Sequence, residues 1–533
     1  MAPLRLAFLT ASMMTRPQGA VETRSSSSPS AEAATLKPMD CSSVRNENDA
    51  HKEAASLTLP TASTGSSTAA STSVPTNVAQ KNSGESGIIH FCFIVHGHQG
   101  KPTDLSYLHH AIKDKASQHG GFATTKSSDM CIVGRNSSSH DDNLTAQRNG
   151  DSRASHDKEA IQTSIEDIIS GESTKSTFVV HNAACNEGST HDGVVKGGER
   201  LANEILEVIR GEIEQSTQHY TQDVTISIVG NSLGGLYGRY AVAILDELLF
   251  VSDEDGTKDE VPHYILDDNI RLHFNVFCST ASPHLGCADR TYVPIPRFAE
   301  VGIAQRLGET GRDLFRVNDL MLELATSPKF TRPLALFRKR IAYANAYGTD
   351  FVVPGSTAAF LDGASDSLHY FNAASEEEAQ SKRQAVDNRV CPATEEGLFV
   401  ATCYTPRLST KDPFETSGND LEVMSKNLDS LGWTKVFVDM RKEIPISAKL
   451  PLVSNSCPIR TLSSNRKAVT SKDLCDAISS GGGGRISLPF GHNSICAFER
   501  GSFSTAFNKG GRPVMDSLAI NLIEDISMWT KNV

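Results

Sequence analysis

Ser232 stands in the pentapeptide Gly230-Asn231-Ser232-Leu233-Gly234, which follows an apolar run and precedes an amphipathic stretch. A strand, a glycine-flanked serine and then a helix form the pattern of a nucleophile elbow, a sharp turn that exposes the serine hydroxyl at the carboxyl end of a sheet. Gly230 and Gly234 would leave room for neighbouring backbone. The alternative is a tight turn whose serine only caps the helix, but a cap does not require glycine on both sides. The segment therefore predicts Ser232 as a nucleophile.

A nucleophilic serine needs a histidine base, and that base needs an acid to orient it. In an elbow fold the acid and the histidine follow the serine along the chain. Asp350 lies in a glycine-containing turn after a candidate strand and is the predicted acid, while Asp439, which could instead pair with Arg441, is the alternative. Downstream of Asp350 there are two histidines, His369 and His492. His369 lies in a polar stretch, so the predicted base is His492, which follows the last candidate strand.

Attack on a carbonyl also requires donors for the developing negative charge. The backbone N–H of Leu233, directly after the serine, is one predicted donor. The other is the N–H of His98, because residues 96–100 (HGHQG) form a glycine-containing turn after the first core strand. A plain glycine-rich turn is the alternative for that loop. No His, Cys, Asp and Glu cluster has metal-ligand spacing, and no dinucleotide or P-loop motif occurs, so we expect neither metal nor cofactor.

Short apolar runs alternate with helical patterns beyond Gly87, which predicts an α/β fold with a mostly parallel central sheet flanked by helices. The runs are β-branched or aromatic-rich, as strands buried on both faces should be. The expected strands are His90–Val95, Thr177–His181, Thr225–Val229, His273–Cys278, Arg340–Ala344 and Trp433–Met440, and the expected helices are Asp104–Lys115, Glu199–Glu212, Leu236–Phe250 and Phe298–Leu307.

Three regions are expected to lie outside this regular pattern. Residues 118–157 and 362–415 are polar and are interpreted as surface insertions, which the chain tolerates because loop closure costs grow slowly with length. Residues 294–330 mix apolar and charged side chains and are interpreted as a cap whose apolar face, including Phe298 and Val301, lines an acyl pocket. The alternative for this segment is a set of ordinary surface helices, since these are amphipathic too.

The first 86 residues differ in composition from the remainder, residues 87–533. From residue 56 to 76, 12 of 21 residues are Ser or Thr, which predicts a disordered region because too little apolar surface is available to offset chain entropy. The first 21 residues contain arginine and no acid. That composition also fits an organelle transit peptide, so a mitochondrion or plastid is the alternative to a cytoplasmic location.

The whole-chain composition excludes several classes of protein. Lys and Arg number 51 against 63 Asp and Glu, a net charge of −12 over 533 residues, which argues against a nucleic-acid partner. No run of 18 apolar residues occurs, so no membrane-spanning helix is expected. The 11 cysteines include no CxxC pair and indicate a reducing compartment without a disulfide framework.

Seven ordered motifs between about residues 88 and 500 resemble a lipase-like serine esterase family, the domain of unknown function 676. The motifs are FIVHGHQGKPTDLSYL, THDGVVKGGERLANEI, ISIVGNSLGGLYGRYAV, ASPHLG, TGRDLF, RKRIAYANAYGTDFVVPGSTA and FGHNSICAF. The resemblance implies an α/β-hydrolase fold with Ser232, Asp350 and His492 in the family's triad positions. Members commonly carry an apolar residue after the first HG, where this chain has His98, so the pocket entrance is expected to differ.

The same resemblance implies hydrolysis of carboxylic esters of acyl lipids, as by a lipase, a phospholipase or a monoacylglycerol lipase. The expected partners are an acyl-lipid ester and, by peripheral contact, a membrane or lipid-droplet surface. Two alternatives stay open. The same three residues could pass the acyl group to an alcohol, as in an acyltransferase, or the fold could serve as a non-catalytic scaffold.

Overall fold

The computed structural model describes twelve stretches of the chain. They are residues 88–124, 176–215, 222–250, 264–266, 270–290, 295–347, 349–371, 397–408, 417–449, 451, 457–480 and 485–530. The Ser/Thr-rich region 1–86, with its suggested transit peptide, lies outside them.

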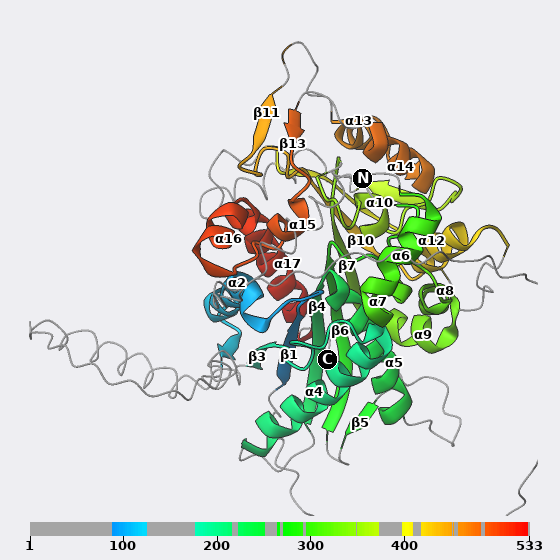
Figure 1. The fold of residues 1–533 in the computed structure, drawn as a ribbon. Helices are drawn as coiled ribbons and strands as arrows, with labels where there is room; N and C mark the ends of the chain where they lie inside the picture. The colour runs from blue at the N-terminus through cyan, green and yellow to red at the C-terminus, as the bar shows by residue number, and fades with distance from the viewer. Residues whose placement is uncertain are drawn as a thin grey trace, which may run out of the picture. The chain divides into compact units, whose positions relative to one another are not determined.

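A central sheet of 11 strands organises the described part of the chain (Figure 1). Its strands run in the order β12-β8-β9-β10-β7-β6-β4-β1-β3-β2, with β5 paired to β6 beside this path. The seven strands from β10 to β2 are parallel, whereas β9, β8 and β12 extend the sheet in antiparallel fashion. The strands are β1 Ile89–Val95, β2 Phe122–Thr124, β3 Ser176–Asn182, β4 Gln222–Asn231, β5 Tyr264–Leu266, β6 Ile270–Thr280, β7 Lys339–Asn345, β8 Leu368–Phe371, β9 Phe399–Tyr404, β10 Thr434–Val438 and β12 Ala468–Thr470, while β11 Ser447–Lys449 and β13 Arg485–Ser487 form a separate two-stranded antiparallel sheet.

Helices cover both faces of the sheet because side chains alternate along each strand. Phe91 and Phe93 of β1 pack with residues of α4 and α5, whereas Cys92 and Ile94 pack with residues of α2 and α17 on the other face. Figure 1 shows the same division. The helices are α2 Ser106–Gln118, α4 Gly193–Gln215, α5 Leu233–Leu249, α6 Arg297–Arg306, α7 Gly308–Leu314, α8 Leu320–Thr326, α9 Pro328–Leu336, α10 Gly355–Ala358, α12 Asp420–Ser430, α13 Pro458–Asn465, α14 Ser471–Ser480, α15 Gly491–Ser494, α16 Gly501–Asn508 and α17 Arg512–Thr530, with 3-10 turns η1 Pro102–Leu105 and η3 Lys509–Gly511.

The predicted α/β class with a mostly parallel sheet is confirmed. Each of the six expected strands corresponds to a strand of the parallel set, namely β1, β3, β4, β6, β7 and β10, and each expected helix overlaps one of α2, α4, α5 and α6. The apolar runs identified them because strands covered by helices on both faces must be apolar nearly throughout.

The described parts of 118–157 and 362–415, which the sequence interprets as surface insertions, contain strands, and most of both stretches lies outside the described residues. β2 adds a parallel edge strand after α2, and β8 and β9 extend the main sheet. His369, set aside as part of a polar stretch, lies fully buried in β8. These strands were missed because they are short, from three to six residues, so each carries little apolar signal.

The segment interpreted as a cap consists of helices α6 to α9 and continues to Leu336 rather than ending at residue 330. Leu324, Phe330 and Leu334 of α8 and α9 are buried in the same core as α4 and α5. Much of the segment therefore packs as ordinary helices. Phe298 of α6, in contrast, is 78% exposed.

Candidate active site

Ser232 lies at the turn between β4, which ends at Asn231, and α5, which begins at Leu233. Its backbone has φ 53° and ψ −124°, a strained conformation for a residue with a side chain, as an elbow requires. Side chains at the flanking glycines would collide with backbone. A Cβ at Gly230 would lie 2.4 Å from the nitrogen of Gly235, and one at Gly234 would lie 2.2 Å from the carbonyl oxygen of Val95.

His492 joins Ser232 to Asp350 through both ring nitrogens. Its Nε2 lies 2.9 Å from Ser232 Oγ, and its Nδ1 lies 2.9 Å from Asp350 Oδ2. Residues separated by 260 and 142 positions in the chain thus form one hydrogen-bonded line. The carboxylate can accept a hydrogen bond from a protonated Nδ1. The unprotonated Nε2 is then the acceptor for the serine hydroxyl.

The Asp350 carboxylate is fixed by three further donors. Oδ1 accepts from the backbone N–H groups of Val352 and Val353 at 2.9 and 2.8 Å, and Oδ2 accepts from Asn345 Nδ2 at 3.2 Å. Asn345 is the last residue of β7. The strand that delivers the acid therefore also supplies a side chain that orients it, and the buried carboxylate has little freedom to rotate.

The loops that carry Asp350 and His492 are joined by backbone hydrogen bonds. Phe351 N–H donates to Pro489 O at 3.0 Å, and Gly491 N–H donates to Thr349 O at 2.6 Å. A Cβ at Gly491 would lie 2.7 Å from that same carbonyl oxygen, so the residue before His492 has to be glycine for this approach. This close pairing sets the distance between acid and base.

The electrostatics of His492 suit a base held against a carboxylate. Burial of the imidazole disfavours its charged form, but the negative charge of Asp350 and the hydrogen bond to it outweigh that effect, and the pKa of His492 is raised above its ordinary value. A neighbouring negative charge favours the protonated ring in this way. The ring is thus prepared to hold the proton that Ser232 would release.

Asp439, the alternative acid, is engaged elsewhere. Its two carboxylate oxygens accept from Nε and Nη2 of Arg441 at 2.8 and 2.7 Å, and Oδ1 also accepts from the Arg441 backbone N–H at 3.1 Å. The pair is buried. The structure thus brings Asp350, and not Asp439, to His492.

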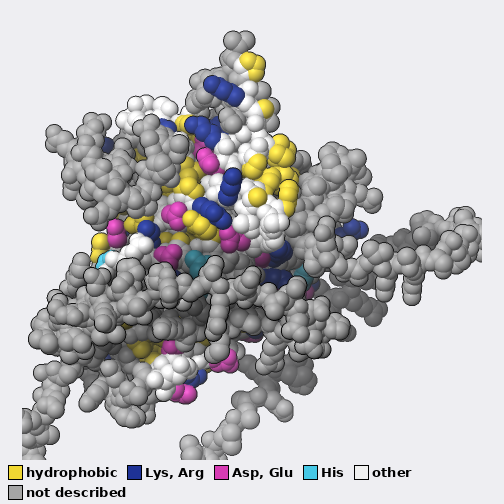
Figure 2. All heavy atoms as spheres, turned by 90° about the vertical axis from the view of Figure 1, so that its left-hand side faces the viewer, with side chains coloured by type: hydrophobic (Ala, Val, Ile, Leu, Met, Phe, Trp, Pro, Cys, Tyr) yellow, Lys and Arg dark blue, Asp and Glu magenta, His cyan; other side chains and the backbone are white. Residues whose placement is uncertain are grey.

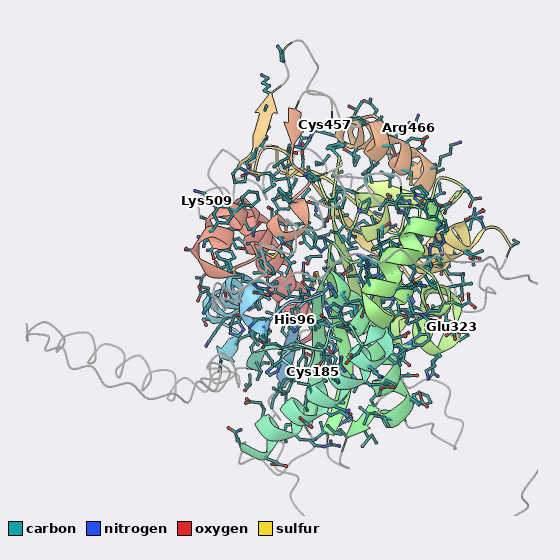
Figure 3. The ribbon with its side chains drawn as sticks, in the orientation of Figure 1. His96, Cys185, Glu323, Cys457, Arg466 and Lys509 are labelled. Carbon is teal, nitrogen blue, oxygen red and sulfur yellow. The ribbon has the colours of Figure 1, made fainter. Side chains whose placement is uncertain are left out.

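The loop of residues 96–100, which we call the oxyanion loop, lies directly against Ser232. A Cβ at Gly97 would lie 2.7 Å from Ser232 Cβ and 3.2 Å from Ser232 Oγ, so backbone approaches the hydroxyl where a side chain would obstruct it. The loop begins at His96, directly after β1 (Figure 3), and is closed by a hydrogen bond from Gly100 N–H to Gly97 O at 3.0 Å. Within the described residues, neither His98 N–H nor Leu233 N–H donates to another protein group.

The imidazole of His98 extends from the oxyanion loop, and both of its ring nitrogens are buried. Burial, with the nearby His191 adding to it, lowers the pKa of His98 to about 4. The ring is therefore neutral near pH 7 and presents one N–H and one lone pair. An apolar residue at this position would present neither.

Three contributors to the site were not identified from the sequence: Asn345, Gly491 and Thr190. Asn345 and Gly491 adjoin the identified strand end and histidine, so their proximity in sequence could have drawn attention to them. Thr190 Oγ1 accepts from Gln99 N–H at 2.9 Å, 91 positions away, and no local pattern marks it.

No group of three or more His, Cys, Asp or Glu side chains in the described stretches could hold a metal ion. None of the helices that the structure describes is both long and apolar enough to span a membrane.

Comparisons with known proteins agree with this geometry. Residues 144–361 match the family model described as "Putative serine esterase (DUF676)". The chain is 30% identical over 201 residues to "Putative lipase C4A8.10" of Schizosaccharomyces pombe, a match that covers 36% of this chain and 23% of that protein. It is also 30% identical over 189 residues to "Putative lipase ROG1" of Saccharomyces cerevisiae, covering 34% and 23%.

The chain spans about a quarter of the length of these curated relatives. Among solved structures, a cell surface hydrolase from Lactobacillus plantarum WCFS1 aligns with 11% identity and a TM-score of 0.22, over 51% of this chain and 75% of that one. The matched residues 144–361 include both the elbow serine Ser232 and the acid Asp350, so the chain is similar to this serine esterase family over the segment that carries them.

Proposed function

We propose that the protein is a lipase-like serine hydrolase that cleaves carboxylic ester bonds of acyl lipids through an acyl-enzyme on Ser232. The observation that carries this proposal is the line of hydrogen bonds from Ser232 through His492 to Asp350, at 2.9 Å on each side of the ring. Such a line turns an unreactive hydroxyl into a nucleophile, because the base stands ready to take its proton.

In the first half of the reaction, Ser232 Oγ attacks the ester carbonyl carbon while His492 Nε2 takes the hydroxyl proton. The carbonyl oxygen becomes negative and accepts hydrogen bonds from the N–H groups of His98 and Leu233. Asp350 stabilises the protonated ring. The C–O bond to the alcohol then breaks, and His492 gives the proton to the departing oxygen.

In the second half, water replaces the alcohol. His492 removes a proton from water, the hydroxide attacks the acyl carbon, and the bond to Ser232 Oγ breaks as the serine recovers its proton. The free acid leaves and the triad returns to its starting state. If an alcohol enters instead of water, the same steps give a new ester, which is the acyltransferase alternative.

The acyl-lipid part of the proposal is supported by the names of the two yeast relatives and by apolar side chains beside the site. Val352, Ile446, Leu488 and Phe503 are exposed by between 39% and 67%. Val352 lies two residues after Asp350, and Leu488 N–H donates to Ile446 O at 3.3 Å, next to the paired strands β11 and β13.

Figure 2 shows hydrophobic side chains together with Lys and Arg on the upper part of one face of the molecule. We propose that the exposed apolar side chains of Val352, Ile446, Leu488 and Phe503 contact a membrane or lipid-droplet surface while the substrate enters. Apolar side chains gain by leaving water for acyl chains, and basic ones are attracted to anionic headgroups.

The test combines a fluorophosphonate probe with a panel of lipid esters. Wild-type protein should be labelled by the probe and should release fatty acid from the esters. Ser232→Ala should not be labelled, and its kcat should fall by several orders of magnitude. Ser227→Ala, a matched change of a buried serine in β4, the strand that leads to Ser232, should keep both. Retention of more than about a tenth of the turnover by Ser232→Ala would exclude Ser232 as the nucleophile.

Product analysis with and without an added alcohol separates the alternatives. A hydrolase releases free acid in both conditions, whereas an acyltransferase forms the new ester when the alcohol is present. A scaffold would show neither product and no labelling.

A further inference from the structure

Gln99, in the oxyanion loop, has both its backbone N–H and its backbone carbonyl oxygen held by side chains. Its N–H donates to Thr190 Oγ1 at 2.9 Å, and its carbonyl oxygen accepts from Arg500 Nη2 at 2.7 Å. The residue has φ 53°, a left-handed conformation that is unfavourable for a residue with a side chain unless its surroundings enforce it. The two contacts supply that enforcement.

Arg500 is itself fixed by Asp104. Its Nε donates to Asp104 Oδ1 at 2.9 Å, and its Nη2 donates to Asp104 Oδ2 as well as to Gln99 O. Asp104 is buried, and its Oδ2 also accepts from the backbone N–H of Lys101 at 2.7 Å. A planar guanidinium that donates to both oxygens of one carboxylate can rotate little. The Nη2 group that also donates to Gln99 O is therefore held in place.

The same segment carries the base. Arg500 follows His492 by eight residues in the chain, and the N–H of its neighbour Glu499 donates to the Asp104 carbonyl at 2.9 Å. One stretch of the chain thus contacts Ser232 through His492 and the oxyanion loop through Arg500. The position of the base and the position of the loop are coupled.

We propose that Arg500 is a positioning residue that holds the oxyanion loop so that the N–H of His98 points at the developing oxyanion. The inference rests on the proposed function for its catalytic consequence, although the contact with the loop stands independently of it. Without Arg500 the Gln99 carbonyl loses its donor, and the loop can relax from its left-handed conformation. The donor would then be misplaced in the transition state, whereas the ground-state ester, which needs it less, would still bind.

The experiment compares Arg500→Ala with Arg512→Ala. Arg512 pairs with Glu499 at 3.1 Å, beside Arg500, and among the described contacts it does not reach the oxyanion loop. In Arg500→Ala, kcat should fall about ten- to a hundredfold with KM nearly unchanged, a smaller loss than deletion of a donor causes. The affinity for a trifluoromethyl ketone, which forms an anionic serine adduct, should fall by the same factor. Arg512→Ala should change neither.

A second measurement does not depend on activity. Hydrogen exchange of the peptide covering residues 96–105 should become faster in Arg500→Ala and stay unchanged in Arg512→Ala. Arg500→Lys should give intermediate values in both measurements, because a lysine ammonium cannot donate to both Asp104 oxygens and to the Gln99 carbonyl at once. If Arg500→Ala does not fold, the double variant Arg500→Ala with Asp104→Asn removes both buried charges and takes its place.

The outcomes are distinguishable from failure of the proposed function. Absence of turnover and labelling in wild-type protein would reject the hydrolase proposal, and the exchange comparison would still decide whether Arg500 holds the loop. Unchanged exchange, or a rise in KM with kcat and ketone affinity intact, would overturn the positioning role.

Discussion

His98 and His191 meet edge to face, with their ring centroids 4.7 Å apart. His191 Nδ1 in turn lies 3.3 Å from the carbonyl oxygen of Leu307, at the junction of α6 and α7. A second connection runs beside it, since Thr310 Oγ1 of α7 donates to Thr190 O at 2.7 Å. The helical segment α6–α9 therefore borders the oxyanion loop at one junction, even though α8 and α9 pack into the core. If the α6–α9 segment acts as a cap, it meets the oxyanion loop at this junction.

Substitution of Phe298 and Val301 by Ser tests the cap hypothesis. If α6 contacts acyl chains, hydrolysis of long-chain esters should fall while a short acetate ester is spared, with each lost methylene contact worth at most roughly 0.8 kcal/mol. Leu248→Ser, which alters an exposed leucine near the far end of α5, is the control and should leave both rates unchanged. Equal effects on both esters, or none, would make α6 a purely structural helix.

Asp350→Asn and Asp439→Asn should differ sharply in activity. The first removes the charge that orients and stabilises the His492 ring, and a loss of roughly ten-thousandfold in kcat is expected. The second disrupts a buried pair with Arg441, so it should lower the thermal midpoint and leave kcat close to wild type. Steady-state kinetics and thermal unfolding of the two variants check this, and equal kinetic losses would contradict the assignment of the acid.

The pH dependence of kcat/KM should report the raised pKa of His492. The ring can act as a base only when it is neutral, so activity should be low in acid and rise with pH. Because Asp350 raises the pKa, the midpoint of this rise should lie above 6.5, the ordinary histidine value. Asp350→Asn should move the residual activity to lower pH. A wild-type midpoint below 6.5 would be inconsistent with the carboxylate's effect on the ring.

Lys435 in β10 is fully buried and donates to Asp429 Oδ1 at 2.5 Å and to His369 Nε2 at 2.8 Å. These contacts join β10, α12 and β8. Lys435→Met would leave the Asp429 carboxylate buried without its cation, and the free energy of unfolding should fall by about 3–5 kcal/mol. Lys426→Met, which removes a more exposed lysine from α12, should cost less than about 1 kcal/mol. Urea unfolding measures the free energy of unfolding of both variants. An equal loss in the two would show that the burial of Lys435 does not make its removal more destabilising.

Deletion of residues 1–86 should leave esterase activity and the thermal midpoint unchanged, because that Ser/Thr-rich composition offers little apolar surface to a core. A marked fall in the midpoint would show that part of this region contributes to the folded domain. Fluorescent fusions of full-length and shortened chains address location separately. An organelle pattern that depends on residues 1–86 would favour a transit peptide over a cytoplasmic location.

Local sequence patterns determined the parallel part of the sheet and the serine elbow. An inner parallel strand must be apolar on both faces, so each of the six expected strands is visible as a continuous run. The elbow is visible because its strain requires glycines at fixed offsets, at Gly230 and Gly234. In both cases the physical requirement falls on residues that are neighbours in the chain.

Tertiary structure decided what depends on residues that are distant in the chain. Asp350 follows one candidate strand and Asp439 lies at the end of another. Only the folded chain shows that His492 meets Asp350 while Arg441 occupies Asp439. The contact between Arg500 and Asp104 joins residues 396 positions apart. A polar side chain carries no local record of its distant partner, because the free energy of a buried ion pair depends on the geometry and desolvation that the whole fold imposes.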